Sequence, residues 1–379
     1  MDKIRLKQPY LMETTDEIRL CAEVDRQGQG ETIWFSAEKE YGVYLTAERA
    51  DAFLVALLPT AMREGADLLC EGTVTKRLLY QINHYLIPML ADNLPELHRI
   101  SVRARAQEGA LSCAGAVGTG WTGGVDSMYT VMEHLSPGEG HYKLTHLLIT
   151  SSGTFLPWKK TEILREQVAK AREGIATDLD GLEVVGVDSN IQELFPEDFM
   201  SFQGFRLASA VLALQKLFGV YLQSSSYSFD EFRFPDYCFS FYELAVLRFF
   251  ETDNTAFYSA GGAYPRAEKL AHLADFPPAW KYLHPCIMVK GDNCGRCKKC
   301  VWAESMLYVM DKLERFSQVF DVEEFKQKKD WYFARAVDLK DPFLVYAFAQ
   351  KGVNIPYVKR MRAMWKKARE EKESDSSED

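Results

Sequence analysis

LSCAGAVGTGWTGGVDS, residues 111–127, carries an apolar segment into a glycine-rich turn, after which the pattern predicts a helix. The two adjacent glycines let the backbone fold closely around an anion, and the helix N-terminus adds a positive dipole end. Thr122 and Ser127 offer hydroxyls to phosphate oxygens. Asp126 repels phosphate unless a metal or a hydrogen bond engages it. In this context the string predicts a phosphate-binding turn rather than an ordinary helix cap.

Short apolar segments alternate with helical segments over the middle of the chain. The expected strands are residues 111–117, 144–149, 182–187, 219–222 and 255–258, and the expected helices lie around residues 127–135, 160–173 and 205–218. Such alternation predicts an α/β fold with a doubly wound parallel five-stranded sheet. Ligands of these sheets bind at the carboxyl ends of the strands.

The pattern changes before and after this region. In the first hundred residues, Asp51, Glu71 and His84 are expected to be surface or packing residues rather than a site. The last residues are charge-rich and lack apolar anchors, which predicts disorder. The expected divisions are an N-terminal α/β domain at 1–108, a domain with the turn at 109–313, a C-terminal helical region at 314–365 and a disordered acidic tail at 366–379.

Four cysteines lie close together in the sequence at 286–300. Cys286, Cys294, Cys297 and Cys300 form the pattern C-x7-C-x2-C-x2-C. Four thiolates at such spacing close a tetrahedral Zn2+ site, so this segment predicts structural zinc. An iron–sulfur cluster uses the same ligands and is the alternative. His284 is a spare candidate ligand, expected instead to lie beside the site.

The composition excludes some functional classes. The 379 residues include 45 Lys and Arg against 54 Asp and Glu, a formal net charge of -9, so a basic nucleic-acid binder is disfavoured. No apolar run is long enough to span a membrane, and the N-terminus lacks the apolar core of an export signal. The expected location is therefore cytoplasmic, where cysteines are thiols or metal ligands rather than disulfides.

The string TGGVDS resembles the S-G-G-x-D-S loop of the PP-loop, or N-type, ATP pyrophosphatases, with Thr122 in place of the first serine. The cysteine pattern is similar to that of 7-cyano-7-deazaguanine synthases in the same family. The resemblance covers about residues 112–313, roughly half the chain. It implies an adenine nucleotide alpha hydrolase-like fold and cleavage of ATP, with Mg2+, between the α and β phosphates.

The resemblance also implies roles for individual residues. Ser224, Ser225 and Ser226 follow the fourth expected strand and are candidates for the acceptor pocket. Arg266 and Lys269 match an R-x-x-K element whose cations neutralise the leaving pyrophosphate, and they are candidate catalytic residues with Asp126 and Ser127. The implied nucleotide-binding residues are Thr122, Gly123, Gly124, Val125, Asp126, Ser127, Ser151 and Ser152.

The first hypothesis is an ATP-dependent ligase that adenylates a carbonyl or carboxyl oxygen of a small-molecule acceptor. A nitrogen or sulfur nucleophile, such as ammonia, an amine or sulfide, then displaces AMP. The alternatives are a sulfurtransferase acting on tRNA or a small molecule, and a non-enzymatic nucleotide-binding regulatory module. Membrane association is not expected, and a homodimer is left open. The acceptor, the nucleophile and the role of the N-terminal domain also stay open.

Overall fold

The computed structural model describes residues 3–353 except 136, 153–159, 180, 195–197, 235–237, 289–290 and 340, and also residues 356 and 363. Two compact units are present. The first contains the chain up to Thr122 together with Thr130–Ala263. The second contains Gly123–Tyr129 together with the chain from Tyr264 on. The predicted acidic tail at 366–379 lies outside the described residues.

The first unit is an α/β structure built on a mixed, mostly parallel sheet. Within the described residues eleven strands form this sheet, in the order β11-β10-β7-β8-β9-β4-β3-β1-β5-β6, with β2 paired to β3. The strands are β1 (Lys3–Leu6), β2 (Tyr10–Glu13), β3 (Glu17–Arg26), β4 (Gln29–Glu38), β5 (Asp67–Thr75), β6 (Val102–Gln107), β7 (Ala116–Gly120), β8 (His146–Thr150), β9 (Glu183–Ser189), β10 (Phe218–Ser224) and β11 (Ala256–Ala260).

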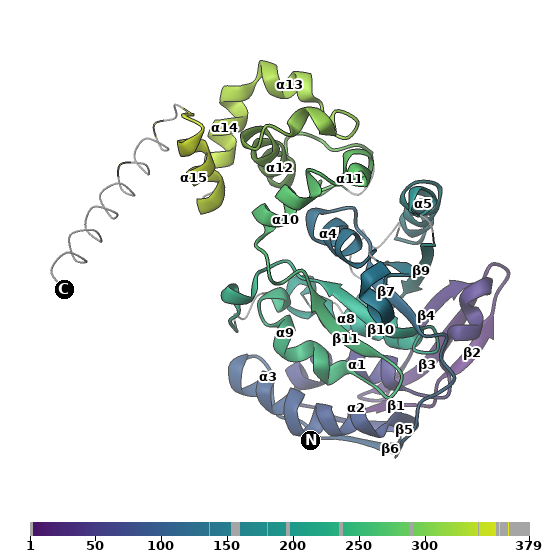
Figure 1. Cartoon of the computed structure of the whole chain (residues 1–379). Helices are drawn as coiled ribbons and strands as arrows, with labels where there is room; N and C mark the ends of the chain where they lie inside the picture. The colour runs from purple at the N-terminus through teal and green to yellow at the C-terminus, as the bar shows by residue number, and fades with distance from the viewer. Residues whose placement is uncertain are drawn as a thin grey trace. The chain divides into compact units, whose positions relative to one another are not determined.

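Five neighbouring strands of this sheet, β11, β10, β7, β8 and β9, are parallel to one another (Figure 1). They overlap the five strands expected from the sequence, with shifted ends, but they are part of a larger mixed sheet, so the expected doubly wound five-stranded sheet is not confirmed. The first was expected at 111–117, but β7 begins at Ala116. The strand begins late because Gly115 takes a left-handed φ of 74°, and because Ala114 donates its N–H to the carbonyl of the distant Lys216, outside the ladder.

The N-terminal strands continue the same sheet. Phe35 and Ser36 of β4 pair antiparallel with Ser189 and Asp188 of β9. Segments on both sides of the expected boundary at residue 108 therefore belong to one sheet. The division into domains at 1–108, 109–313 and 314–365 stays a prediction.

Helix α1 forms the centre of the core of the first unit. Every residue of α1 from Asp51 to Met62 is buried, as expected for a helix that is apolar on all sides. It packs against β5 and against α8, and it ends at Gly65, whose φ of 63° forms a left-handed cap. The helices described in this unit are α1 (Asp51–Glu64), α2 (Lys76–Gln81), α3 (Ile87–Asn93), α5 (Lys160–Glu173), α6 (Ile175–Asp178), α7 (Ile191–Leu194), α8 (Phe199–Ala213) and α9 (Glu243–Val246).

The second unit is helical. Helix α4 (Val125–His134) begins in it, and α12 packs against α10, α14 and α15. The other helices are α10 (Arg266–Leu273), α11 (Pro277–Tyr282), α12 (Lys298–Val309), α13 (Val322–Gln327), α14 (Lys329–Val337) and α15 (Pro342–Gln350). Among the described residues of the whole chain, no helix has the length and apolar character needed to cross a membrane.

Candidate functional site

The predicted phosphate-binding turn lies directly before α4, and its conformation depends on one glycine. Gly123 has a φ of 70°, and a Cβ atom there would lie 3.2 Å from Cβ of His284 and 3.3 Å from the carbonyl oxygen of Tyr282. The backbone angle therefore favours glycine strongly, and a side chain at this position would also crowd the neighbouring backbone. Ser127 is buried, and its hydroxyl donates to the carbonyl of Gly124 at 3.2 Å, which ties the first turn of α4 to the loop.

Two cations meet the carboxylate of Asp126 in the first turn of α4. Nη2 of Arg266 lies 2.7 Å from Oδ2 of Asp126, and Nζ of Lys269 lies 3.5 Å from Oδ1. Arg266 and Lys269 are three residues apart on α10, so they share one face of that helix. The structure thus brings together three of the four candidate catalytic residues, and the fourth, Ser127, is adjacent in the chain.

The burial of Lys269 makes this group unusual. Its side chain is 1% exposed, whereas lysine is almost never fully buried unless it is paired. Together the three side chains carry one net positive charge beside a helix N-terminus. Asp126 therefore does not present an isolated negative charge to an anion, and the arrangement suits a ligand with several negative charges.

A backbone hydrogen bond connects the turn to the cysteine segment. The N–H of His284 donates to the carbonyl of Gly123 at 2.7 Å, two residues before Cys286. His284 is not part of the cysteine group found among the described residues, and its backbone supports the turn instead. The turn is thus in direct contact with the segment that leads to the first cysteine.

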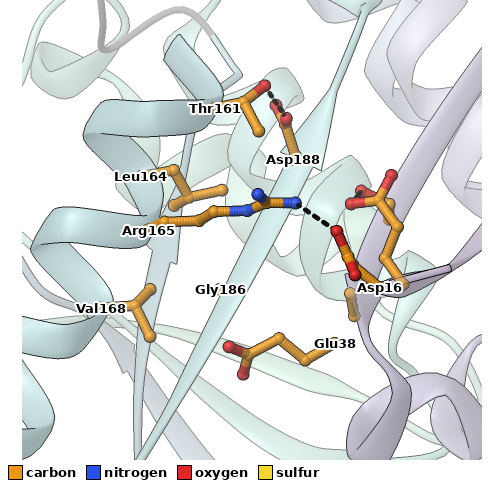
Figure 2. A pocket seen from close by; sticks show the side chains of 11 residues that line it. Asp16, Glu38, Thr161, Leu164, Arg165, Val168, Gly186 and Asp188 are labelled. Carbon is orange, nitrogen blue, oxygen red and sulfur yellow. Dashed lines mark hydrogen bonds and ion pairs between the residues drawn. The ribbon is translucent and has the colours of Figure 1, made fainter.

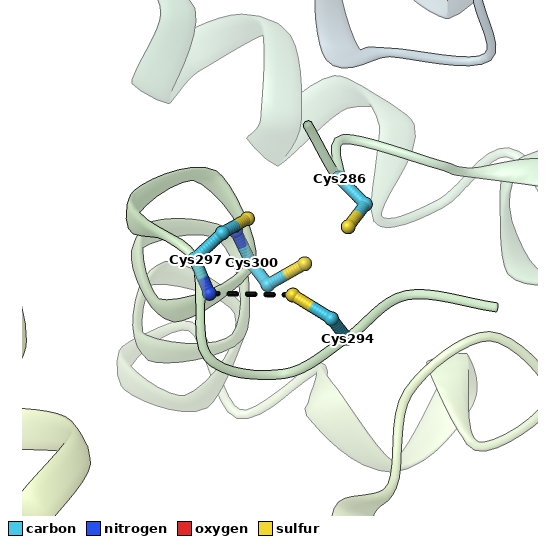
Figure 3. A group of neighbouring side chains, drawn as sticks. All are labelled: Cys286, Cys294, Cys297 and Cys300. Atoms are coloured by element: carbon cyan, nitrogen blue, oxygen red, sulfur yellow. Dashed lines mark hydrogen bonds between the residues drawn. The ribbon is translucent and has the colours of Figure 1, made fainter. Parts of the chain in front are cut away.

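The four predicted metal ligands converge in space. The Sγ atoms of Cys286, Cys294, Cys297 and Cys300 all lie within 4.8 Å of one another, and Figure 3 shows them facing a common centre beside the start of α12. Zn–S bonds of about 2.3 Å in a tetrahedron place sulfur atoms about 3.8 Å apart, so this group fits Zn2+. Gly295, with a φ of 64°, forms the bend between the second and third cysteines.

Backbone N–H groups stabilise the thiolate form of some cysteines in this cluster. Burial disfavours the thiolate of Cys294, but hydrogen bonds from the N–H groups of Arg296 and Cys297 and from the thiols of Cys286 and Cys297 together outweigh burial and lower its pKa to about 7. The N–H of Cys300 points to Sγ of Cys297 at 3.5 Å, which makes Cys297 the N-cap of α12. Burial raises the pKa of Cys300, so a metal is needed to hold that thiolate.

Two charged residues near these groups have surroundings that the sequence did not predict. Lys299 lies in the first turn of α12, and burial and then Arg266 lower its pKa, whereas Asp126 raises it. Glu304 is completely buried on α12, and in the described part of the chain neither of its carboxylate oxygens has a hydrogen-bond partner. Burial and then Glu324 raise the pKa of Glu304 to about 9. The only indication in the sequence that Glu304 lies near the cysteine cluster is its spacing of four residues from Cys300 on one helix.

The candidate residues of the first unit have their hydroxyls engaged within the protein. Ser151 is fully buried and donates to Asp188, and Ser152 is paired with Thr150 at 2.6 Å. Ser225 is buried and donates to the carbonyl of Tyr227. The predicted roles of Ser151 and Ser152 in nucleotide binding stay predictions.

The chain finds no match among protein-family models, curated proteins or solved structures. The interpretation of the charged group at the turn and of the cysteine cluster therefore rests on the residues and their geometry alone.

Proposed function

We propose that this chain is an ATP-dependent ligase of the PP-loop type. In this proposal an acceptor carbonyl or carboxyl oxygen attacks the α-phosphorus of ATP, and the bond to the β-phosphate oxygen breaks. Pyrophosphate leaves with that electron pair, and a nitrogen or sulfur nucleophile then displaces AMP from the adenylated acceptor. Mg2+ supplies further charge neutralisation to the phosphates.

The observation that carries the proposal is the convergence of Arg266 and Lys269 on Asp126 at the N-terminus of α4. Backbone N–H groups of the turn beside Gly123 bind phosphate oxygens, and the two cations stabilise the charge that develops on the leaving pyrophosphate. Asp126 holds both cations in place.

The sheet of the first unit gives independent support. Counted along the chain, the five parallel strands lie in the order third, second, first, fourth, fifth. The order reverses between β7 and β10, and such a reversal marks the place where doubly wound sheets bind nucleotides. The turn follows β7 in the chain. This agrees with the proposed adenine nucleotide alpha hydrolase-like fold.

Four cysteine ligands favour a closed, structural Zn2+ site over a catalytic one, because a catalytic metal keeps an open position. In this proposal the metal stabilises the segment that contacts Gly123 and takes no part in the chemistry.

The test is the identity of the nucleotide product. Purified protein is incubated with ATP, Mg2+, either ammonium or sulfide, and a panel of carboxylate and nucleobase acceptors, and nucleotides are separated by chromatography. AMP and pyrophosphate formed only when an acceptor is present support adenylation. Exclusive formation of ADP overturns the proposal, since it indicates attack on the γ-phosphate. AMP formed with sulfide but not with ammonium indicates sulfur transfer.

A further inference from the structure

A cavity of about 280 Å³ lies within the first unit, between α5 and the strands β4 and β9. Figure 2 shows that Thr161, Leu164, Arg165 and Val168 of α5 form one side of it, with Gly186 and Asp188 on β9. Asp16, Glu17, Ser36, Ala37 and Glu38 complete the lining. Its volume is close to the lower end of the range for small-molecule sites. None of the candidate nucleotide-binding residues lines it.

Asp188 is a buried carboxylate that lines this cavity. It is 4% exposed, and it accepts hydrogen bonds from the hydroxyls of Ser151 and Thr161 and from the N–H of Ser189. Across the described residues, no Lys, Arg or His forms an ion pair with it. Burying an uncompensated charge is costly, so a positive charge entering the cavity is favoured here.

Arg165 supplies the opposite charge on the same cavity. Its guanidinium lies 3.7 Å from Asp16, and both side chains are mostly exposed. This separation is longer than a hydrogen bond. Among the residues that the structure describes, Arg165 has no hydrogen-bond acceptor, so its donors are available to an incoming anion.

These two groups of opposite charge line the same cavity, which suits a molecule that carries both charges. Thr161 and Arg165 are four residues apart on α5, about one helical turn, and Thr161 donates to Asp188 at 2.6 Å. Arg165 and Asp188 both line the cavity, and Thr161 therefore connects Asp188 to the helix that carries Arg165. Leu164 and Val168 provide an apolar wall beside them.

The remaining carboxylates of the lining each form an ion pair with an arginine. Glu17 pairs with Arg19 at 2.7 Å, and Glu38 pairs with Arg172. They still repel a further negative charge. A ligand side chain that reaches them must therefore be neutral or positive.

We propose that this cavity binds a free α-amino acid with a neutral aliphatic side chain. The ammonium group contacts Asp188, the carboxylate contacts Arg165, and the side chain packs against Leu164 and Val168. This binding is independent of ATP cleavage. Each charge of the ligand meets a protein group that lacks a strong partner of opposite charge, and the aliphatic wall excludes water beside them.

The test measures binding of L-leucine, isoamylamine and isocaproate to the full chain by titration calorimetry, after a thermal-shift survey of the proteinogenic amino acids. Leucine is expected to bind, and the amine and the acid, which each lack one charged group, are expected to bind at least about tenfold more weakly. Aspartate and glutamate are expected not to bind.

Arg165→Gln and Asp188→Asn should each weaken leucine binding by about tenfold or more, whereas Lys170→Gln, on an exposed position of the same helix, should not. Because Arg165 is exposed, its variant keeps the fold even if the Asp188 variant does not. The proposal is overturned if no amino acid binds, if isoamylamine binds as tightly as leucine, or if Arg165→Gln leaves the affinity unchanged.

Discussion

Arg266 and Asp126, 140 positions apart in the chain, form an ion pair with Nη2 and Oδ2 at 2.7 Å. In the sequence, Asp126 was expected to repel phosphate unless a metal or a hydrogen bond engaged its carboxylate. The ion pair with Arg266 meets that requirement. Cationic side chains engage the carboxylate directly. Because Lys269 joins from the next turn of α10, the group keeps a net positive charge after Asp126 is counted.

Replacing Arg266 by Gln should lower the rate of AMP formation on the order of 100-fold, since one charge-stabilising donor at a developing anion is lost. The measurement is AMP release per minute at saturating ATP. Arg315→Gln is the matched control, because Arg315 also pairs with a carboxylate, Asp275, on the surface of the same unit. Equal rates for wild type and Arg266→Gln would remove Arg266 from the proposed mechanism.

Much of this site was predictable because its geometry is local. The turn needs a left-handed glycine before a helix, and Arg266 and Lys269 share a face through their spacing of three residues. The cysteine spacing likewise predicted the converging thiolates. What the sequence did not predict is the contact between α10 and Asp126, because no local pattern shows which distant helix packs beside the turn.

Burial was the other property that sequence patterns missed. Glu304 and Asp188 look like ordinary acidic residues of a helix and of a strand end, yet they are 0% and 4% exposed. Contacts with distant residues also explain why observed strand ends differ from the expected ones. The apolar run at 111–115 is not in the sheet, because the carbonyl of Lys216 takes the N–H of Ala114. Such pairings arise from tertiary structure, which overrides local propensity.

Asp51 was expected to be a surface or packing residue, and the structure places it in the core of the first unit. It is 0% exposed and accepts hydrogen bonds from the backbone and hydroxyl of Thr75 and from Gln215. Asp51→Ala should lower the free energy of unfolding by about 3 kcal/mol, because buried donors lose their acceptor. Urea denaturation measures this change. Asp92→Ala, at an exposed ion pair, should change it by less than about 1 kcal/mol.

The cysteine cluster should bind one equivalent of Zn2+ per chain, measured by elemental analysis of the purified protein. Cys297→Ser should lose the metal and yield poorly soluble protein, since a structural zinc site contributes on the order of 10 kcal/mol to local folding. Cys113→Ser, outside the cluster, should retain full metal content. Iron with a brown visible spectrum would contradict the zinc prediction and favour sulfur chemistry.

Metal removal should also affect the turn. His284, two residues before Cys286, donates to the carbonyl of Gly123, so loss of the metal releases a segment that supports the turn. A chelator strong enough to strip the protein should therefore weaken ATP binding, and added Zn2+ should restore it. Unchanged ATP affinity in fully stripped, folded protein would show that the two groups are independent.

Glu304 should make the stability of the second unit depend on pH. Its pKa is about 9 in the folded protein against an ordinary value of 4.5, mainly because burial disfavours the carboxylate. Between these values the folded state keeps a proton that the unfolded chain releases, so the free energy of unfolding falls as pH rises. Glu304→Gln removes this penalty while keeping a similar shape. The variant should be more stable than wild type by a few kcal/mol near about pH 8.5, and the difference should shrink towards about pH 5.

Zinc-saturated wild type and variant are compared by urea denaturation at both pH values, so that thiol protonation affects the two proteins alike. Glu314→Gln, an exposed substitution of the same type, should show no such pH-dependent difference, because a solvated carboxylate titrates alike in the folded and unfolded states. If the difference between Glu304→Gln and wild type is the same at both pH values, Glu304 does not hold its proton in the folded protein. That outcome would require a buried cationic or hydrogen-bonding partner for its carboxylate, since an uncompensated charge at full burial is too costly to keep.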